Sequence, residues 1–178
     1  VSTEEEIQLG SLENQIIHYT NHIRSNKEWQ FVKDVSDEQA LSDSSLVWEP
    51  VSLPHTANTE PVVMTGPQWQ GNAYYRKSFT PSTHLKGKHV ALYFEGAMQV
   101  ADIYLNGGHL MSNYSGYLPF YVDLTGHLKI GEENEIFVKL NNEDNPQVPP
   151  GKPLDQLDFN IFSGIYRNVW LVVKDELH

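Results

Sequence analysis

One hairpin signal constrains the fold more than any other feature of the chain. In residues 99–106 apolar side chains alternate with polar ones, which is the period of a half-buried strand. Asn106-Gly107 follows, and this pair favours a type I′ turn because both central positions of that turn need a positive φ. The return strand is predicted over residues 108–113. A two-residue turn joins antiparallel strands, so the sequence predicts an antiparallel sheet.

The same alternation recurs through the rest of the chain. Further strands are predicted at residues 15–19, 28–33, 46–53, 73–80, 88–95, 119–124, 135–140 and 167–174. The acidic stretch 34–45 is interpreted as a surface loop, and no segment has the pattern of a long helix. About nine or ten short strands with frequent turn signals are typical of an antiparallel β-sandwich or jelly roll. We therefore predict an all-β sandwich over residues 15–178, preceded by a flexible tail at residues 1–14.

Composition excludes several kinds of function. The chain has no cysteine, so disulfides, thiolate metal sites and cysteine nucleophiles are excluded. Its formal net charge of -11 opposes binding to nucleic acid or to an anionic membrane, whereas a neutral ligand such as a sugar carries no such penalty. No apolar run approaches the ~18 residues of a membrane span. The histidines form no metal-ligand pattern, so we expect no metal site.

Two loops are the places where function is expected. The connection over residues 56–71 is longer than most loops in a compact domain, and loops of that length are usually functional. The stretch 154–170 begins as a loop with Asp155 and Asp158, turns at Ser163-Gly164 and ends as a strand. A rigid strand behind an acidic loop can hold a carboxylate in a fixed position.

Several motifs of the chain resemble those of glycoside hydrolase family 2, the group of β-galactosidases, β-glucuronidases and β-mannosidases. The matching segments, in order, are Leu53-Pro54-His55, residues 71–79, 94–97, 101–107, 116–125 and 131–141, and Ser163-Gly164-Ile165-Tyr166-Arg167. Two positions depart from the family's pattern: Tyr74 stands where tryptophan is commoner, and Ser163 replaces the first glycine of "GGIYR". The matches run from about residue 46 to 173, and they imply the family's N-terminal sugar-binding domain, a galactose-binding-like jelly roll.

The resemblance implies a fragment of a larger multidomain enzyme, not catalytic by itself. The family retains anomeric configuration, which needs two carboxyl groups about 5–5.5 Å apart. In the family both are glutamates on a separate (β/α)₈ barrel, and this chain is too short for a barrel of about 250 residues. Its Asn-Glu pairs at 134–135 and 142–143 lack the family's context. We expect no catalytic residue here, and a parent β-galactosidase that hydrolyses terminal β-linked sugars.

The resemblance also indicates which residues complete a sugar pocket. Asp158 lies six residues before Gly164, where the family carries an aspartate that reaches the barrel's pocket and contacts hydroxyls of the terminal sugar. A carboxylate accepts two strong hydrogen bonds from neighbouring hydroxyls, so Asp158 is the main predicted substrate-binding residue. Trp69, Asn72 and Phe159 are lesser candidates for the same role. Without the motif, Asp158 would be interpreted as a loop carboxylate that faces solvent.

The implied partners are a terminal β-linked sugar and two domains of the same parent chain, the catalytic barrel and an immunoglobulin-like domain. No cofactor is expected in this chain, and sodium or magnesium is expected only in the parent enzyme. Two other interpretations stay open: a free-standing carbohydrate-binding module, and a structural domain that packs on the barrel without touching sugar. The sequence does not fix the compartment, although a bacterial periplasmic or extracellular location is expected.

Overall fold

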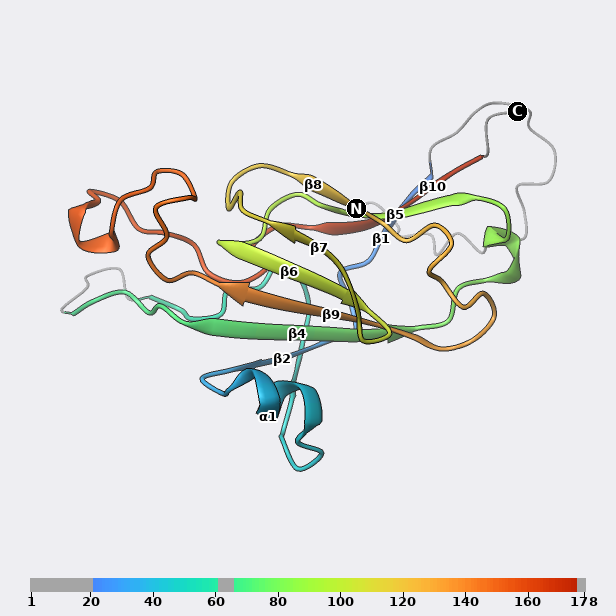
Figure 1. Ribbon diagram of the computed structural model, residues 1–178, viewed down its shortest axis with the longest axis horizontal. Coiled ribbons are helices and arrows are strands. Elements are labelled where there is room, and N and C mark those ends of the chain that lie inside the picture. Colours follow the sequence, from blue (N-terminus) through green and yellow to red (C-terminus); the bar gives the residue numbers. More distant parts are fainter. Residues whose placement is uncertain (1–20, 61–65, 176–178) are drawn as a thin grey trace, which may run out of the picture.

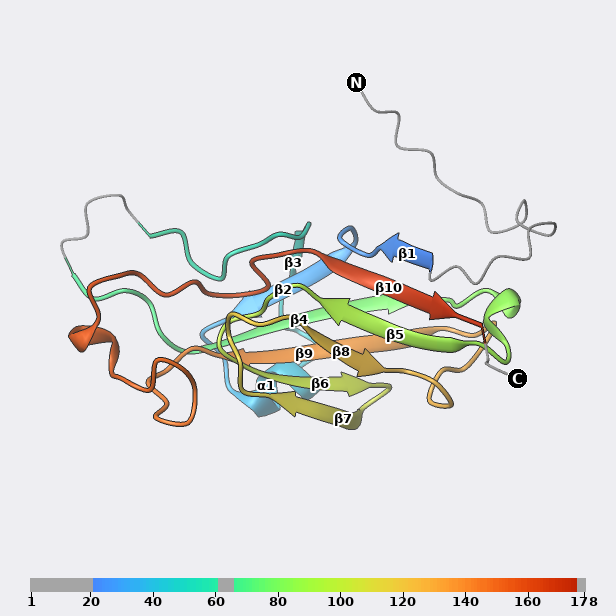
Figure 2. The same cartoon turned by 90° about the horizontal axis from the view of Figure 1, so that it is seen from above.

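The computed structural model describes residues 21–60 and 66–175, which form two antiparallel sheets packed face to face (Figure 1, Figure 2). The four-stranded sheet has the order β1 (Asn21–Arg24), β10 (Val169–Lys174), β5 (His89–Phe94) and β8 (Phe120–Asp123). The six-stranded sheet has the order β3 (Glu49–Val51), β2 (Trp29–Lys33), β4 (Asn72–Phe79), β9 (Asn134–Asn141), β6 (Val100–Leu105) and β7 (Gly108–Asn113). The predicted antiparallel β-sandwich is confirmed.

The core lies between the two sheets and is built from alternate residues of each strand. The four-stranded sheet contributes the buried side chains of Val90, Leu92, Phe94, Phe120, Val122, Val169 and Val173. The six-stranded sheet contributes those of Trp29, Phe31, Tyr75, Ala101, Ile103, Leu105, Ile136, Val138 and Leu140. Because side chains of a strand alternate between faces, the residues between these ones point away from the core.

The predicted hairpin is confirmed in detail. Asn106 has a φ of 51° and Gly107 a φ of 80°, which are the two positive values that a type I′ turn needs. Strands β6 and β7 pair on either side of the turn, with Leu105 opposite Gly108. The Asn106 side chain donates to Asn134 Oδ1 at 2.9 Å and accepts from the Glu135 N–H at 3.0 Å. The turn residue therefore also attaches the hairpin to the start of β9.

The prediction of a surface loop over residues 34–45 is wrong, because a short helix, α1 (Asp37–Ser42), lies within it. Ser36 and Gln39 form a capping box: the Gln39 N–H donates to Ser36 Oγ at 3.2 Å, and the Ser36 N–H donates to Gln39 Oε1 at 3.0 Å. Ala40 packs on Tyr74 and Phe137, on the outer side of the six-stranded sheet. This second cluster stabilises the helix, which is too short to be stable alone.

Other boundaries differ from the prediction. Strand β3 is shorter than the predicted strand at 46–53, and it lies at an edge of its sheet, where Pro50 is tolerated. Strand β1 has no counterpart in the prediction, while the predicted strand at 15–19 and the tail at 1–14 lie outside the described residues. Two 3₁₀ helices, η2 (Thr83–Leu85) and η3 (Leu154–Gln156), complete the elements. Within the described ranges, the helices are all too short and too polar to cross a bilayer.

Candidate functional site

Two long loops leave the same end of the sandwich. The connection between β3 and β4 and the connection between β9 and β10 lie at the left end in both views (Figure 1, Figure 2). Hydrogen bonds join the two connections, although about 100 residues of sequence separate them. The loop that carries Asp158 is therefore held by a second loop as well as by strand β10.

The turn at Gly164 fixes where the Asp158 loop returns to the sandwich. Gly164 has a φ of +76°, and a Cβ built there would lie 2.8 Å from both the Ala57 nitrogen and the His55 oxygen, and closer still to the Tyr75 hydroxyl. A side chain is thus excluded by both backbone conformation and space. The neighbouring backbone is also paired, since the His55 N–H donates to the Ile165 carbonyl at 2.8 Å and Met98 N–H to the Gly164 carbonyl at 3.0 Å.

Ser163 has a structural role that the glycine of the "GGIYR" pattern could not fill. Its side chain is buried, with 4% of the residue exposed. Its Oγ accepts the Asn58 N–H at 3.2 Å and lies 3.0 Å from the Thr56 hydroxyl. The Thr56 hydroxyl also donates to the Asn58 carbonyl at 2.8 Å. One hydroxyl therefore ties the Asp158 loop to the start of the other loop.

Gln68 holds the loop closer to its tip. The Ile161 N–H donates to Gln68 Oε1 at 3.0 Å, and Gln68 Nε2 donates to the carbonyl of the same residue. One amide side chain thus satisfies both backbone groups of Ile161, three residues after Asp158. Sequence reasoning missed Gln68, because no motif marks a glutamine that pairs with a backbone 93 positions away.

The Asp158 side chain projects from this supported loop. Asp158 is exposed, and it makes no side-chain hydrogen bond to any other residue that the structure describes. Phe159 beside it is 48% exposed. The backbone on both sides is held, by Gln68 at Ile161 and by a hydrogen bond from Leu154 N–H to Asp144 Oδ1 at 2.9 Å. The carboxylate therefore keeps its full capacity to accept hydrogen bonds from a ligand.

The other predicted residues, Trp69 and Asn72, are engaged inside the domain. The Trp69 indole donates to Asp34 Oδ1 at 3.0 Å, and Lys33 Nζ lies 5.0 Å from the centre of its ring. Asn72 Oδ1 accepts a hydrogen bond from Asn141 Nδ2 at 2.9 Å, within the pair of β4 and β9. Among the described residues, no hydrogen bond links either side chain to Asp158. Their sugar-binding role stays a prediction, with the Trp69 indole N–H and Asn72 Oδ1 already bonded inside the domain.

An exposed aromatic patch, which we define as Tyr117, Phe162 and Tyr166, lies beside the same loop. The Phe162 and Tyr166 rings stack with centroids 4.7 Å apart and planes 8° from parallel. The Tyr166 hydroxyl donates to the Gly116 carbonyl at 2.7 Å, which brings the neighbouring Tyr117 to the patch. Phe162 is 55% exposed. Sequence reasoning missed the stacked pair, because its two rings lie four residues apart on either side of Gly164, where no strand or helix period applies.

Half-buried His55 and fully buried Tyr75 form a pair beside Gly164. The His55 Nδ1 lies 2.8 Å from the Tyr75 hydroxyl. Burial lowers the pKa of His55 and raises that of Tyr75. Both groups are therefore neutral at neutral pH, and their hydrogen bond helps to hold the backbone around Gly164. In residues 21–60 and 66–175, no three histidine or acidic side chains gather closely enough to hold a metal ion.

Comparison with known proteins gives consistent similarities. Residues 25–175 match the family described as glycosyl hydrolases family 2, sugar binding domain. A β-glucuronidase of Formosa agariphila is 40% identical over 166 residues, which cover 86% of this chain and 17% of that protein. A β-galactosidase of Thermoanaerobacter pseudethanolicus is 35% identical over 156 residues, which cover 86% of this chain and 21% of that protein.

Solved structures agree with the sequence matches. A crystal structure from Bacteroides fragilis superposes with a TM-score of 0.79 at 38% identity, covering 88% of this chain and 23% of that one. The chain therefore spans about a fifth of the length of the relatives that it matches. In those relatives, about four fifths of the protein lies beyond the part that this chain resembles.

Proposed function

The chain belongs to the sugar-binding domains of glycosyl hydrolase family 2, and from that membership we propose that it is the N-terminal domain of a larger glycoside hydrolase. The resemblance predicted from its motifs is confirmed. The parent hydrolyses terminal β-linked sugars with retention, through a barrel and two glutamates outside this chain. This domain cleaves no bond itself, and its task is to complete the sugar pocket. A sodium or magnesium ion belongs to the parent enzyme, and this chain needs no cofactor of its own.

The observation that carries the proposal is that the Asp158 carboxylate is exposed, and unpaired among the described residues, on a loop held in place. The turn at Gly164 and the Gln68 amide hold the loop around it, while its carboxylate is exposed and makes no side-chain hydrogen bond within the described residues. Because the loop is already fixed and the carboxylate is already free in the described part of the chain, a ligand can bind Asp158 without breaking a bond there and with little loss of loop freedom. The arrangement favours a ligand that brings hydroxyl donors to the carboxylate, as a terminal sugar does.

The aromatic patch supports docking on a further domain. Three exposed or half-exposed rings beside the Asp158 loop leave apolar area in water, and such patches mark interaction surfaces. An interface that buries Tyr117, Phe162 and Tyr166 would bring Asp158 to the boundary between the two domains. We propose the catalytic barrel as the occupant of this surface.

The sugar that the parent removes has two candidates. The expectation from the resemblance is a β-galactosidase, whereas the relative that is 40% identical is named a β-glucuronidase and the one that is 35% identical a β-galactosidase. Assay of the full-length protein with p-nitrophenyl β-galactoside and β-glucuronide separates the two. A parent that releases nitrophenol from neither substrate would contradict both specificities.

The decisive variant is Asp158→Ala in the full-length protein. Loss of a charged hydrogen bond to the sugar costs about 1.5–3 kcal/mol, so kcat/KM should fall by at least about tenfold. Asp155→Ala is the matched control, because Asp155 is an exposed carboxylate of the same loop. The control should keep kcat/KM within about twofold, and both variants should unfold at the same temperature as the parent. An unchanged kcat/KM for Asp158→Ala would refute the sugar contact.

The two rival functions predict different results. A purely structural domain predicts that Asp158→Ala leaves kcat/KM unchanged. A free-standing carbohydrate-binding module predicts that the isolated chain binds oligosaccharide tightly through the Asp158 loop, measured by calorimetry. Our proposal predicts no tight binding there, since the isolated chain supplies only one side of the pocket.

A further inference from the structure

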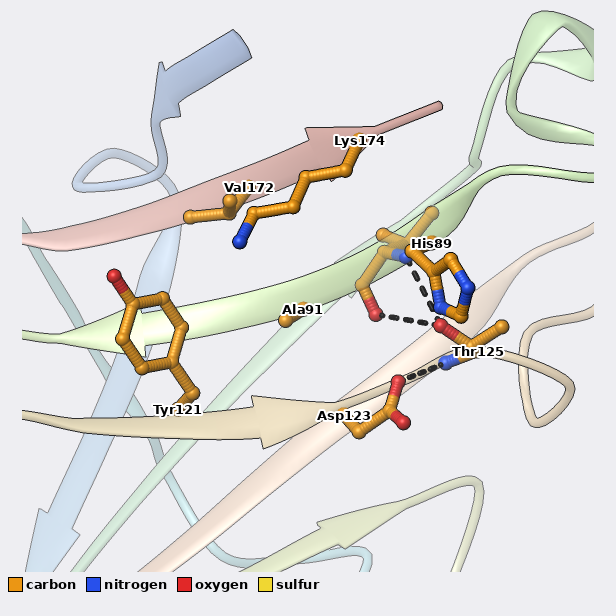
Figure 3. A pocket seen from close by; sticks show the side chains of 8 residues that line it. His89, Ala91, Tyr121, Asp123, Thr125, Val172 and Lys174 are labelled. Carbon is orange, nitrogen blue, oxygen red and sulfur yellow. Dashed lines mark hydrogen bonds between the residues drawn. The ribbon is translucent and has the colours of Figure 1, made fainter. Parts of the chain in front are cut away.

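The outer face of the four-stranded sheet contains a hollow of about 270 Å³ that the proposed function does not use (Figure 3). It is lined by His89, Val90, Ala91, Tyr121, Asp123, Thr125, Val172 and Lys174. Its walls come from β10, β5 and β8, near the C-terminal end of β10, whereas the Asp158 loop extends from the opposite end of the sandwich (Figure 1). A ligand in this hollow would therefore not touch that loop.

The hollow exists because a small residue lies in the middle of the face. In the strand register, Ala91 of β5 lies between Val172 of β10 and Asp123 of β8. Larger side chains surround its methyl group, with Tyr121 on one side and His89 on the other (Figure 3). The partly exposed Ala91 therefore forms an apolar floor below the level of the surrounding side chains, and Val172 beside it is 2% exposed.

An aromatic ring forms one wall and is fixed in place. Tyr121 is 54% exposed and stacks on Tyr93, with ring centroids 4.6 Å apart and planes 29° from parallel. Tyr93 pairs in register with Trp170, whose indole donates to Glu95 Oε1 at 2.7 Å. Neighbouring strands thus support the Tyr121 ring, so it can pack on a ligand without losing much freedom.

Polar groups of both kinds surround the apolar floor. The Thr125 N–H donates to Asp123 Oδ1 at 2.8 Å, and Thr125 Oγ1 accepts the Val90 N–H at 3.0 Å. The Thr125 hydroxyl and N–H lower the pKa of Asp123, and the N–H bond orients the carboxylate through one of its two oxygens. Within the described part of the chain, the Lys174 ammonium and the Tyr121 hydroxyl have no hydrogen-bond partner. One ionised acceptor and two donors are therefore available around one apolar floor.

We propose that this hollow binds a single sugar ring. A sugar has hydroxyls for the Asp123 acceptor and the Lys174 donor, and C–H groups for the Tyr121 ring and the Ala91 floor. A purely apolar ligand would leave the polar groups unpaired, and a purely anionic one would face the Asp123 carboxylate. The volume lies just below that of sites for drug-sized molecules, about 300–1,000 Å³, and suits one ring. Binding in the millimolar range is expected for so small a site.

The test follows backbone amide shifts of the ¹⁵N-labelled 178-residue chain by NMR, during titration with galactose, glucose and glucuronate. Saturable shifts should cluster at residues 89–91, 121–125 and 172–174. Ala91→Leu, which fills the hollow from a partly exposed strand position, should weaken binding at least about tenfold. Ser78→Leu is the control, an equal enlargement at an exposed position of β4 on the other sheet, and should bind as the parent does.

A second variant guards against a folding defect in the first. Lys174→Met keeps the apolar stem of an exposed side chain and removes only the donor, so it should also weaken binding while the amide spectrum stays dispersed. Asp158→Ala should leave these shifts unchanged, which separates this site from the proposed function. The proposal is overturned if none of the three sugars causes saturable shifts. It is also overturned if the Ala91→Leu variant binds the sugar with the affinity of the parent.

Discussion

At the scale of single residues, Gly164 determines the position of the site. Gly164 has a positive φ six residues after Asp158, and backbone atoms of His55 and Ala57 fill the space that a side chain would need. The sequence marked this glycine through its motif, but the atoms that exclude a side chain come from a loop more than a hundred residues earlier. Ser163 and Gln68 belong to the same arrangement, and neither pairing was predictable without the fold.

Gly164→Ala should lower the free energy of unfolding far more than the backbone conformation alone explains. Gly126→Ala is the matched control, because Gly126 has a φ of +77°, close to the +76° of Gly164, and nothing lies within 4 Å of a Cβ built on it. The control should cost about 1 kcal/mol, from the left-handed conformation. Gly164→Ala should cost at least about 2 kcal/mol more, measured by urea unfolding. An equal loss of unfolding free energy in the two variants would contradict steric crowding around Gly164.

His55 should make stability depend on pH. Its pKa in the folded chain is lowered by burial, below the ordinary value of about 6.5, so the unfolded chain binds its proton first as pH falls. The stability that neutral His55 supports is present above about pH 6.5 and is lost as pH falls below it. Urea midpoints between about pH 5 and 7.5 should show this loss.

His55→Gln should flatten that dependence, while His84→Gln, a change at an exposed histidine, should keep it. The same slope in both variants would exclude His55 as its source.

At the scale of elements, the sequence predicted the strands, whose apolar side chains alternate with a period of two. It missed an element that is stabilised mainly by tertiary contacts. Strand β7 and the turn at Asn106-Gly107 occur as predicted, because the turn type needs those residues and the alternation continues on both sides. Helix α1 was missed, since its 6 residues give no period and its stability comes from Tyr74 and Phe137 of the sheet. The capping box at Ser36 and Gln39 was the available signal.

Ser36→Ala should destabilise the domain by about 1 kcal/mol, because the Gln39 N–H loses its acceptor. Ser36→Thr is the control, since threonine also caps helices and should cost only a few tenths of that. The measurement is the shift in urea midpoint for each variant. If Ser36→Ala were no more costly than Ser36→Thr, the capping hydrogen bond would not contribute to stability.

At the scale of the whole molecule, the chain spans about a fifth of the length of its relatives. That share agrees with our proposal that it is one domain of a longer glycoside hydrolase, to whose sugar pocket it adds the Asp158 carboxylate. The strand alternation and the family motifs predicted the fold class, because both depend on residues that lie close together in the sequence; the motif-based role of Asp158 stays a prediction. The aromatic patch and the hollow on the four-stranded sheet combine residues from distant strands, so no linear pattern indicated them.

The most direct test of the central claim is a crystal structure of the full-length protein with a terminal sugar bound. The account predicts an Asp158 carboxylate oxygen within about 2.5–3.0 Å of a sugar hydroxyl, with the Gly164 turn unchanged and the aromatic patch buried against the barrel. A bound sugar that leaves Asp158 in solvent, with no protein-to-sugar contact from its loop, would contradict the account.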